Sequence, residues 1–191
     1  CTKSIDSVIR NNLIYNNTGH GIRFANGTLT ITGNTLYGNG LDQIRGPAEG
    51  ELTISNNIVV NGVKSGIEVS NGGINISTYN LVWGNATGNW VGLPMGTGDF
   101  SLDPLLVDPD GADNLLGGVN GADDRFQLGT SPASPAFDSG SAAATTFAFS
   151  DGSTQADRTS RIDNVLDGTS SDGAMVNLGF HYAATLPSLD S

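Results

Sequence analysis

An asparagine-centred phrase that returns four times constrains the fold of this 191-residue chain more than any other feature. The pivotal residues lie 22, 23 and 23 positions apart and are Asn12, Asn34, Asn57 and Asn80. A second column keeps the same register ten positions further on, at Ile22, Ile44, Ile67 and Trp90. Short β-branched runs that recur with this period, separated by Asn and Gly corners, predict a parallel β-solenoid.

Each repeat contains three short apolar runs joined by three corners. Residues 29–32 and 52–55 alternate apolar and polar side chains, which is the pattern of a half-buried strand. A single turn cannot bury its apolar face, so stability has to come from stacking the turns about 4.8 Å apart. We therefore expect an all-β fold, a right-handed parallel β-helix of about four turns, in which the pivotal asparagines form a hydrogen-bonded ladder.

Charge divides the chain into two parts. Residues 1–98 carry five basic and five acidic side chains, whereas residues 99–191 carry fourteen Asp and three Arg, a net charge of −11. We expect the β-helix at residues 1–92, a Gly-rich seam at 93–98, and an acidic, loop-rich β segment after it that packs on the β-helix as a cap or anchor. Such acidity excludes a nucleic-acid-binding protein and favours divalent cations as partners.

The acidic part contains a candidate calcium site. Asp108, Asp110 and Asp113 stand at positions 1, 3 and 6 of one tight loop with Gly between them, and Asp123 and Asp124 can close the site from the other side. Calcium prefers six to eight oxygen ligands in irregular geometry. The alternative is a solvated loop held by Asx-turns.

The lone cysteine and four sequons bear on processing. Cys1 allows no internal disulfide, so it is either an arbitrary start within a longer chain or the lipid-modified terminus of a bacterial lipoprotein. No apolar run reaches membrane-spanning length. The candidate N-glycosylation sites are Asn16, Asn26, Asn75 and Asn85, and they matter only if the host glycosylates exported proteins.

Phrases in the second half carry a family resemblance. They are Asp103-Pro-Leu-Leu-Val-Asp108, Ser134-Pro-Ala-Phe-Asp138-Ser-Gly140 and Val176-Asn-Leu-Gly-Phe-His-Tyr182. With the repeats before them, they resemble secreted right-handed parallel β-helix proteins of bacteria and archaea, which carry pectate-lyase-like repeats and a choice-of-anchor-type C-terminal segment. The resemblance implies export and adds weight to calcium in the acidic loop. This chain has Asn177 where that family usually has Asp. No single activity follows from the resemblance.

A charge column offers the only candidates for catalysis. Eleven positions after the first three pivotal asparagines stand Arg23, Arg45 and Glu68, with Lys64 nearby. Pectate-lyase-like chemistry uses an Arg or Lys base close to a calcium ion, so these residues are the catalytic candidates if the chain is an enzyme. The alternative, which we favour, is a surface charge ladder of small energetic worth.

A column of large side chains parallels the ladder. It consists of Tyr15, Tyr37, Val60 and Trp83. These side chains either stack sugar rings or pack beneath the acidic half, and packing is the more common outcome.

The sequence favours a non-enzymatic, calcium-stabilised surface or matrix module outside a bacterial or archaeal cell. The first turn begins by residue 8 with no capping element before it, so we expect its strand edges to bind a further copy end to end, which would build filaments, or an upstream part of a longer chain. The alternatives are a polysaccharide lyase or hydrolase acting on acidic glycans, or a carbohydrate-binding module.

Overall fold

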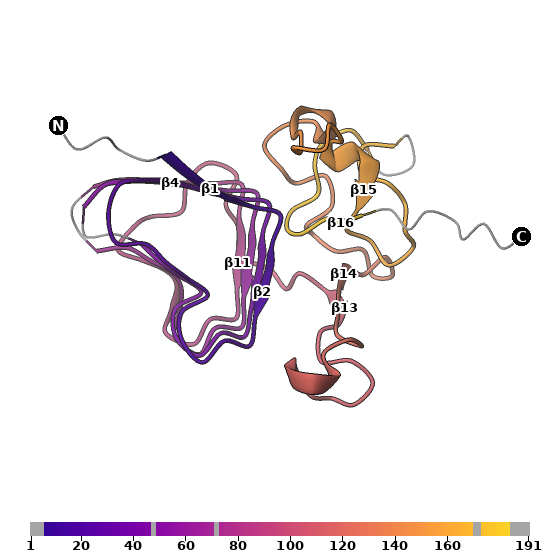
Figure 1. Ribbon diagram of the computed structural model, residues 1–191, viewed down its shortest axis with the longest axis horizontal. Helices are drawn as coiled ribbons and strands as arrows, with labels where there is room; N and C mark the ends of the chain where they lie inside the picture. Colours follow the sequence, from indigo (N-terminus) through magenta and orange to yellow (C-terminus); the bar gives the residue numbers. More distant parts are fainter. Residues whose placement is uncertain (1–5, 47–48, 71–72, 170–172, 184–191) are drawn as a thin grey trace, which may run out of the picture.

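The computed structural model describes residues 6–46, 49–70, 73–169 and 173–183 (Figure 1). In its first half each turn of the chain contributes one strand to each of three parallel sheets. Sheet 1 contains β1 (Asp6–Arg10), β4 (Thr28–Thr32), β7 (Glu51–Ser55) and β10 (Ile74–Thr78). Sheet 2 contains β2 (Leu13–Tyr15), β5 (Thr35–Tyr37), β8 (Ile58–Val60) and β11 (Leu81–Trp83). Sheet 3 contains β3 (Ile22–Arg23), β6 (Ile44–Arg45), β9 (Ser65–Glu68) and β12 (Gly88–Val91).

Register within the sheets follows the sequence period. Ile9 pairs with Ile31 and Ile31 with Ile54, one turn apart in each case. Ile22 likewise pairs with Ile44 in sheet 3. The prediction of an all-β parallel solenoid of about four turns is therefore confirmed.

One hydrophobic core lies on each side of sheet 2. Inside the solenoid, Ile31, Leu36 and Val59 are fully buried. Ile58 and Val60 point the other way, yet they are at most 1% exposed because the second half of the chain covers them. An uninterrupted apolar run is what a strand buried on both faces requires.

The second half packs beside the outer face of sheet 2 (Figure 1). Its strands are β13 (Leu106–Asp108), β14 (Arg125–Leu128), β15 (Arg158–Thr159) and β16 (Tyr182–Ala183). Its 3₁₀ turns are η1 (Gly118–Asn120), η2 (Ala144–Thr146) and η3 (Gln155–Asp157). β13 pairs with β14 and β15 with β16, both antiparallel. Leu128, Ala136 and Leu178 supply its side of the second core.

Two of the corners that precede pivotal asparagines join the two halves. Asn56 adopts a left-handed conformation (φ 59°), and its side chain forms two hydrogen bonds with Ser141, at 2.9 Å to the hydroxyl and 2.8 Å from the backbone N–H. Asn11, with φ 53°, bonds the backbone of His181 in the same way, at 2.9 and 2.6 Å. Both halves are thus held in one arrangement by side-chain amides at the corners.

Hydrogen bonding of the solenoid continues past the Gly-rich segment expected at residues 93–98. The backbone N–H of Phe100 donates to the carbonyl of Asn80 at 2.9 Å, and Val82 donates to Phe100 at 3.0 Å. Residues 99 and 100 therefore cover part of the fourth turn.

Candidate functional site

The four pivotal asparagines form a continuous ladder along one corner of the solenoid. The side-chain oxygen of Asn34 accepts hydrogen bonds from the backbone N–H (2.9 Å) and the side-chain amide (3.1 Å) of Asn12. Asn57 receives the same pair of bonds from Asn34, and Asn80 receives it from Asn57, at 2.9–3.0 Å. Asn34, Asn57 and Asn80 are fully buried. Their role is structural: each asparagine-to-asparagine bond runs to the next turn, and the side-chain amides of Asn34, Asn57 and Asn80 also donate to a carbonyl of the preceding turn.

Asp99 ends this ladder. Its Oδ1 accepts from the backbone N–H (2.8 Å) and the side-chain amide (3.0 Å) of Asn80, while its Oδ2 accepts from Ser77 and Gly96. A carboxylate has no hydrogen to pass on to another rung. The repeat period misses Asp99 because it follows Asn80 by only 19 positions. An acceptor-only residue close after the last rung is the signal that would have found it.

A second ladder runs along the next corner and lies outside the four-fold phrase. Asn39 accepts from the backbone N–H (3.1 Å) and the side-chain amide (2.8 Å) of Asn17. Asn89 accepts from Asn85 in the same way, at 3.3 and 3.0 Å. Gly62 stands between Asn39 and Asn85, so one rung has no side chain of its own.

Gln43 fills the missing rung from the preceding turn. Its amide donates to the Val60 carbonyl at 3.0 Å, and its side-chain oxygen accepts from the amide of Asn39. A Cβ added at Gly62 would lie 2.9 Å from the Gln43 Nε2 atom. The Gln43 side chain therefore occupies the place that an asparagine at position 62 would take.

The two ends of the solenoid differ. Within the described ranges no strand pairs with the outer edges of β1, β2 and β3, which we call the open end. Ile9 and Ile14 point inward there and are only partly buried, whereas Ile31 and Leu36 one turn further on are 0% exposed. At the far end Phe100 pairs with β11. Among the described residues, the open end thus presents unpaired strand edges above a partly covered layer of the core.

The predicted charge column lies on sheet 3. Arg23 pairs in register with Arg45, and Arg45 with Glu68. The Arg45 guanidinium contacts the Glu68 carboxylate and lies 3.5 Å from the Asp42 carboxylate, which His20 approaches at 3.3 Å. Asp42 is 2% exposed. Arg45 therefore compensates two carboxylates and is held by them.

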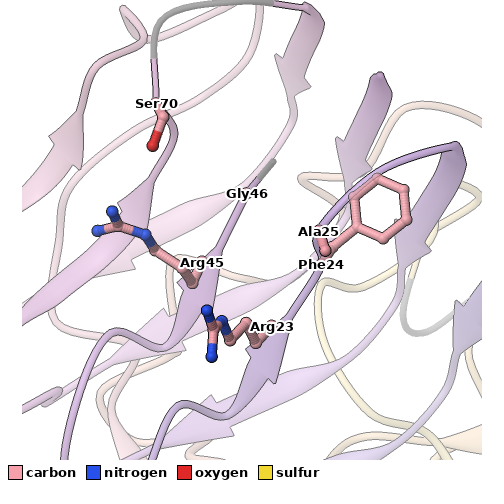
Figure 2. Close-up of a pocket in the computed structure, with 6 residues that line it drawn as sticks. All are labelled: Arg23, Phe24, Ala25, Arg45, Gly46 and Ser70. Atoms are coloured by element: carbon pink, nitrogen blue, oxygen red, sulfur yellow. The ribbon is translucent and has the colours of Figure 1, made fainter. Parts of the chain in front are cut away.

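Arg23 is different, because it has no ion-pair or hydrogen-bond partner among the residues that the structure describes. Figure 2 shows Arg23 and Arg45 next to each other on neighbouring strands. They border a cavity of about 240 Å³, which Phe24 and Ser70 also line. Lys64 is exposed and lies outside this lining. The arrangement can bind an anion at Arg23, while the charge of Arg45 is already balanced.

The acidic loop uses its carboxylates mainly to bind its own backbone. Asp123 and Asp124 accept hydrogen bonds from backbone N–H groups of the loop at 2.8–3.3 Å. One oxygen each of Asp113, Asp123 and Asp124 is buried without a hydrogen-bond partner. Asp108 and Asp110 make no side-chain hydrogen bond within the described chain. In that part of the chain no group of three or more His, Cys, Asp or Glu is placed to hold a metal ion.

The asparagines of the four sequons differ in how accessible their side-chain amides are. Asn85 is 9% exposed, and its amide is engaged in the second ladder. Asn75 pairs in register with the inward-facing Leu52, and Asn16 bonds the Leu116 carbonyl. Asn26 is exposed and makes no side-chain hydrogen bond to any described residue. Of the four, Asn26 offers the most accessible amide.

The column of large side chains is split by the structure. The rings of Tyr15 and Tyr37 lie 4.7 and 5.5 Å from the ring of Phe126, so both tyrosines pack beneath the second half. Burial, and then the neighbouring Asp124 carboxylate, raise the pKa of Tyr15 above its usual value. Trp83 is half-buried and borders a separate cavity.

Stacked parallel strands and asparagine ladders define this class of protein as a parallel β-helix. A family model described as "Right handed beta helix region" matches residues 2–97, half of the chain, and the chain belongs to this family. Neither a curated protein nor a solved structure matches it. In the described ranges no helix is long and apolar enough to cross a membrane. The family establishes the fold, whereas activity has to be argued from the sites.

Proposed function

We propose that the chain is a non-enzymatic extracellular structural module whose open end docks a second copy of itself. The observation that carries this proposal is the contrast between the two ends. β1, β2 and β3 have no described strand on their outer edges and lie over partly buried core residues, whereas at the far end Asp99 and Phe100 cover β11, with β10 and β12 as edge strands. Free edges of this kind are templates for β-augmentation.

The chemistry of the open end suits a further strand layer. Asn12 is exposed, and its side-chain oxygen has no donor among the described residues, although each later rung receives two hydrogen bonds. Each copy offers the same end, so the contact is isologous and places β1 beside β1 of its partner. A filament needs a second free end. Since Asp99 and Asn89 terminate both ladders, a pair of copies is better supported than a filament.

An extracellular, cell-surface location in a bacterium or archaeon is part of the proposal. It rests on the β-helix family and on the resemblance of the second half to secreted surface proteins.

Calcium stabilisation is a further part of the proposal, supported by the three unpartnered buried oxygens of Asp113, Asp123 and Asp124. Millimolar calcium is expected to raise the melting temperature, and the Asp110→Ala plus Asp113→Ala variant is expected to abolish the rise. An unchanged melting temperature removes calcium from the account.

The docking proposal is tested by sedimentation velocity over a range of protein concentrations. Val8 and Ile76 occupy the same outward column of sheet 1, at its opposite ends, and are 65% and 48% exposed. Lysine on an edge strand discourages pairing with another chain. The unmodified chain is expected to dimerise with rising concentration, Val8→Lys to weaken the dimer, and Ile76→Lys to leave it unchanged. A monomer at every concentration contradicts the proposal.

A polysaccharide lyase or hydrolase acting on acidic glycans is the second candidate. The observation that favours it is the unpaired guanidinium of Arg23 beside a cavity. Its test is release of unsaturated uronate from polygalacturonate or alginate in the presence of calcium, lost in Arg23→Ala and Arg45→Ala. Retention of these glycans without turnover indicates a carbohydrate-binding module instead. If the chain neither cleaves nor retains these glycans, the lyase or hydrolase candidate is ruled out.

A further inference from the structure

A second cavity, of about 310 Å³, lies where the chain leaves the solenoid for the second half. Tyr37, Asn61 and Trp83 line it from the solenoid, Asp103 lines it from the connection to β13, and Leu106 lines it from β13 itself. Small-ligand sites are concave, and their volumes start near 300 Å³. The cavity thus has room for one small ring, and its lining combines aromatic and polar side chains.

Register fixes the geometry of its aromatic walls. Tyr37 pairs with Val60 and Val60 with Trp83, so the two aromatic side chains stand two strands apart, about 9–10 Å along the solenoid axis. Val60 between them is fully buried and belongs to the second core. Phe126 packs against Tyr37 in an edge-on contact, with 5.5 Å between ring centroids. The walls are therefore held by the sheet and by the second half before any ligand arrives.

Several polar groups at this cavity have donors or acceptors that form no hydrogen bond within the described chain. Within the described chain, the Tyr37 hydroxyl, the Trp83 indole N–H and the Asn61 side-chain amide make no hydrogen bond. Asp103 uses one carboxylate oxygen to accept from the backbone N–H of Leu105 at 2.9 Å, which leaves the other oxygen free. Donors and acceptors thus border an aromatic surface without satisfying one another.

We propose that this cavity binds a neutral pyranose unit of a glycan. The C–H groups on one face of such a ring suit the electron-rich face of Trp83, while its hydroxyls can both donate to Asp103 and accept from Asn61. A uronate or sulfated sugar is disfavoured, because Asp103 borders the cavity and the chain carries a net charge of −11. This site is independent of the open end and of the Arg23 cavity.

The two tryptophans provide the assay. Trp83 borders the cavity, whereas Trp90 lies in sheet 3, in register with Ile67. The Trp90→Phe variant keeps Trp83 as sole reporter, and Trp83→Phe keeps Trp90 as the matched control. Cellohexaose, laminarihexaose and galactohexaose are added to each folded variant and followed by tryptophan fluorescence, with trigalacturonate as the acidic comparison.

At least one neutral oligosaccharide is expected to change the fluorescence of Trp90→Phe saturably and to leave that of Trp83→Phe unchanged. Affinity, measured by calorimetry, is expected to fall at least about tenfold in Trp83→Ala and to fall in Asp103→Ala. The proposal is overturned if none of the neutral probes binds, if only trigalacturonate binds, or if affinity is the same in Trp83→Ala. Circular dichroism melting confirms that each variant is folded.

Discussion

Asp99 receives from Asn80 the same pair of hydrogen bonds, from backbone and side-chain amide, that each asparagine of the ladder receives from the one before it. The other carboxylate oxygen accepts from the Ser77 hydroxyl at 2.6 Å and from the Gly96 backbone at 2.9 Å. An acidic side chain thus completes an amide ladder and satisfies four donors at once. Because it cannot donate further, the ladder stops where the fold turns into the second half.

Replacement of Asp99 tests this role. Asp99→Ala leaves the backbone N–H of Asn80 and the donors of Ser77 and Gly96 without an acceptor, so the free energy of unfolding is expected to fall by about 2–4 kcal/mol. Asp99→Asn keeps one oxygen for Asn80 but turns an NH₂ group towards Gly96, so its cost should be smaller. Urea unfolding measures both. Equal stability of Asp99→Ala and the unmodified chain contradicts the assignment.

Gln43 and Gly62 should be energetically coupled. Gln43→Ala removes a partner from the Asn39 amide and from the Val60 carbonyl, both buried, and is expected to cost about 2–3 kcal/mol. A Cβ at position 62 approaches Gln43 Nε2 at 2.9 Å and Asn85 Oδ1 at 2.8 Å, and the Gln43→Ala background removes the first of these two clashes. The double-mutant cycle is therefore expected to show a favourable coupling of at least about 1 kcal/mol. Strict additivity would show that Gln43 does not fill the rung.

The two arginines of the charge column should differ in their effect on stability. Arg45→Ala leaves Asp42, which is 2% exposed, without its guanidinium partner and is expected to cost about 1–3 kcal/mol. Arg23→Ala is expected to change stability by less than about 0.5 kcal/mol, because its side chain is exposed and makes no bond within the described chain. Chemical denaturation compares them. Equal losses would mean that the column acts as one unit.

The raised pKa of Tyr182 predicts that the folded chain loses stability at alkaline pH. Burial raises its pKa from 10.0 to about 12. Between these two values the folded chain keeps a proton that the unfolded chain releases, so the stabilisation is complete below pH 10 and disappears as pH rises towards 12. Thermal melting at several pH values should show this decline, and Tyr182→Phe should reduce it. An identical decline in both proteins would assign it to other groups.

Much of the first half was predictable because identical residues recur at one period. Asn12, Asn34, Asn57 and Asn80 take the same place in successive turns, and one period fixes both the register and the outward charge column. Asp99 could not be predicted in this way, because it follows Asn80 by 19 positions and so does not fit the period. Gln43 could not be predicted in this way either, since its side chain serves a rung in the next turn.

The contacts between the two halves could not be predicted from spacing. Asn56 binds Ser141 across 85 positions, and Asn11 binds His181 across 170. Both asparagines look like ordinary corner residues, and nothing local marks their partners. The Trp83 cavity is equally hidden, because its lining combines sheet 2 with the connection to β13.

Hydrogen exchange of the β1 amides at low and high protein concentration tests the central claim, that the open end binds a second copy. β10, the edge strand of the same sheet at the far end, is the internal control. The proposal predicts that exchange in β1 slows as concentration rises, while exchange in β10 stays the same. Equal exchange of β1 at both concentrations, or slowing confined to β10, would contradict it.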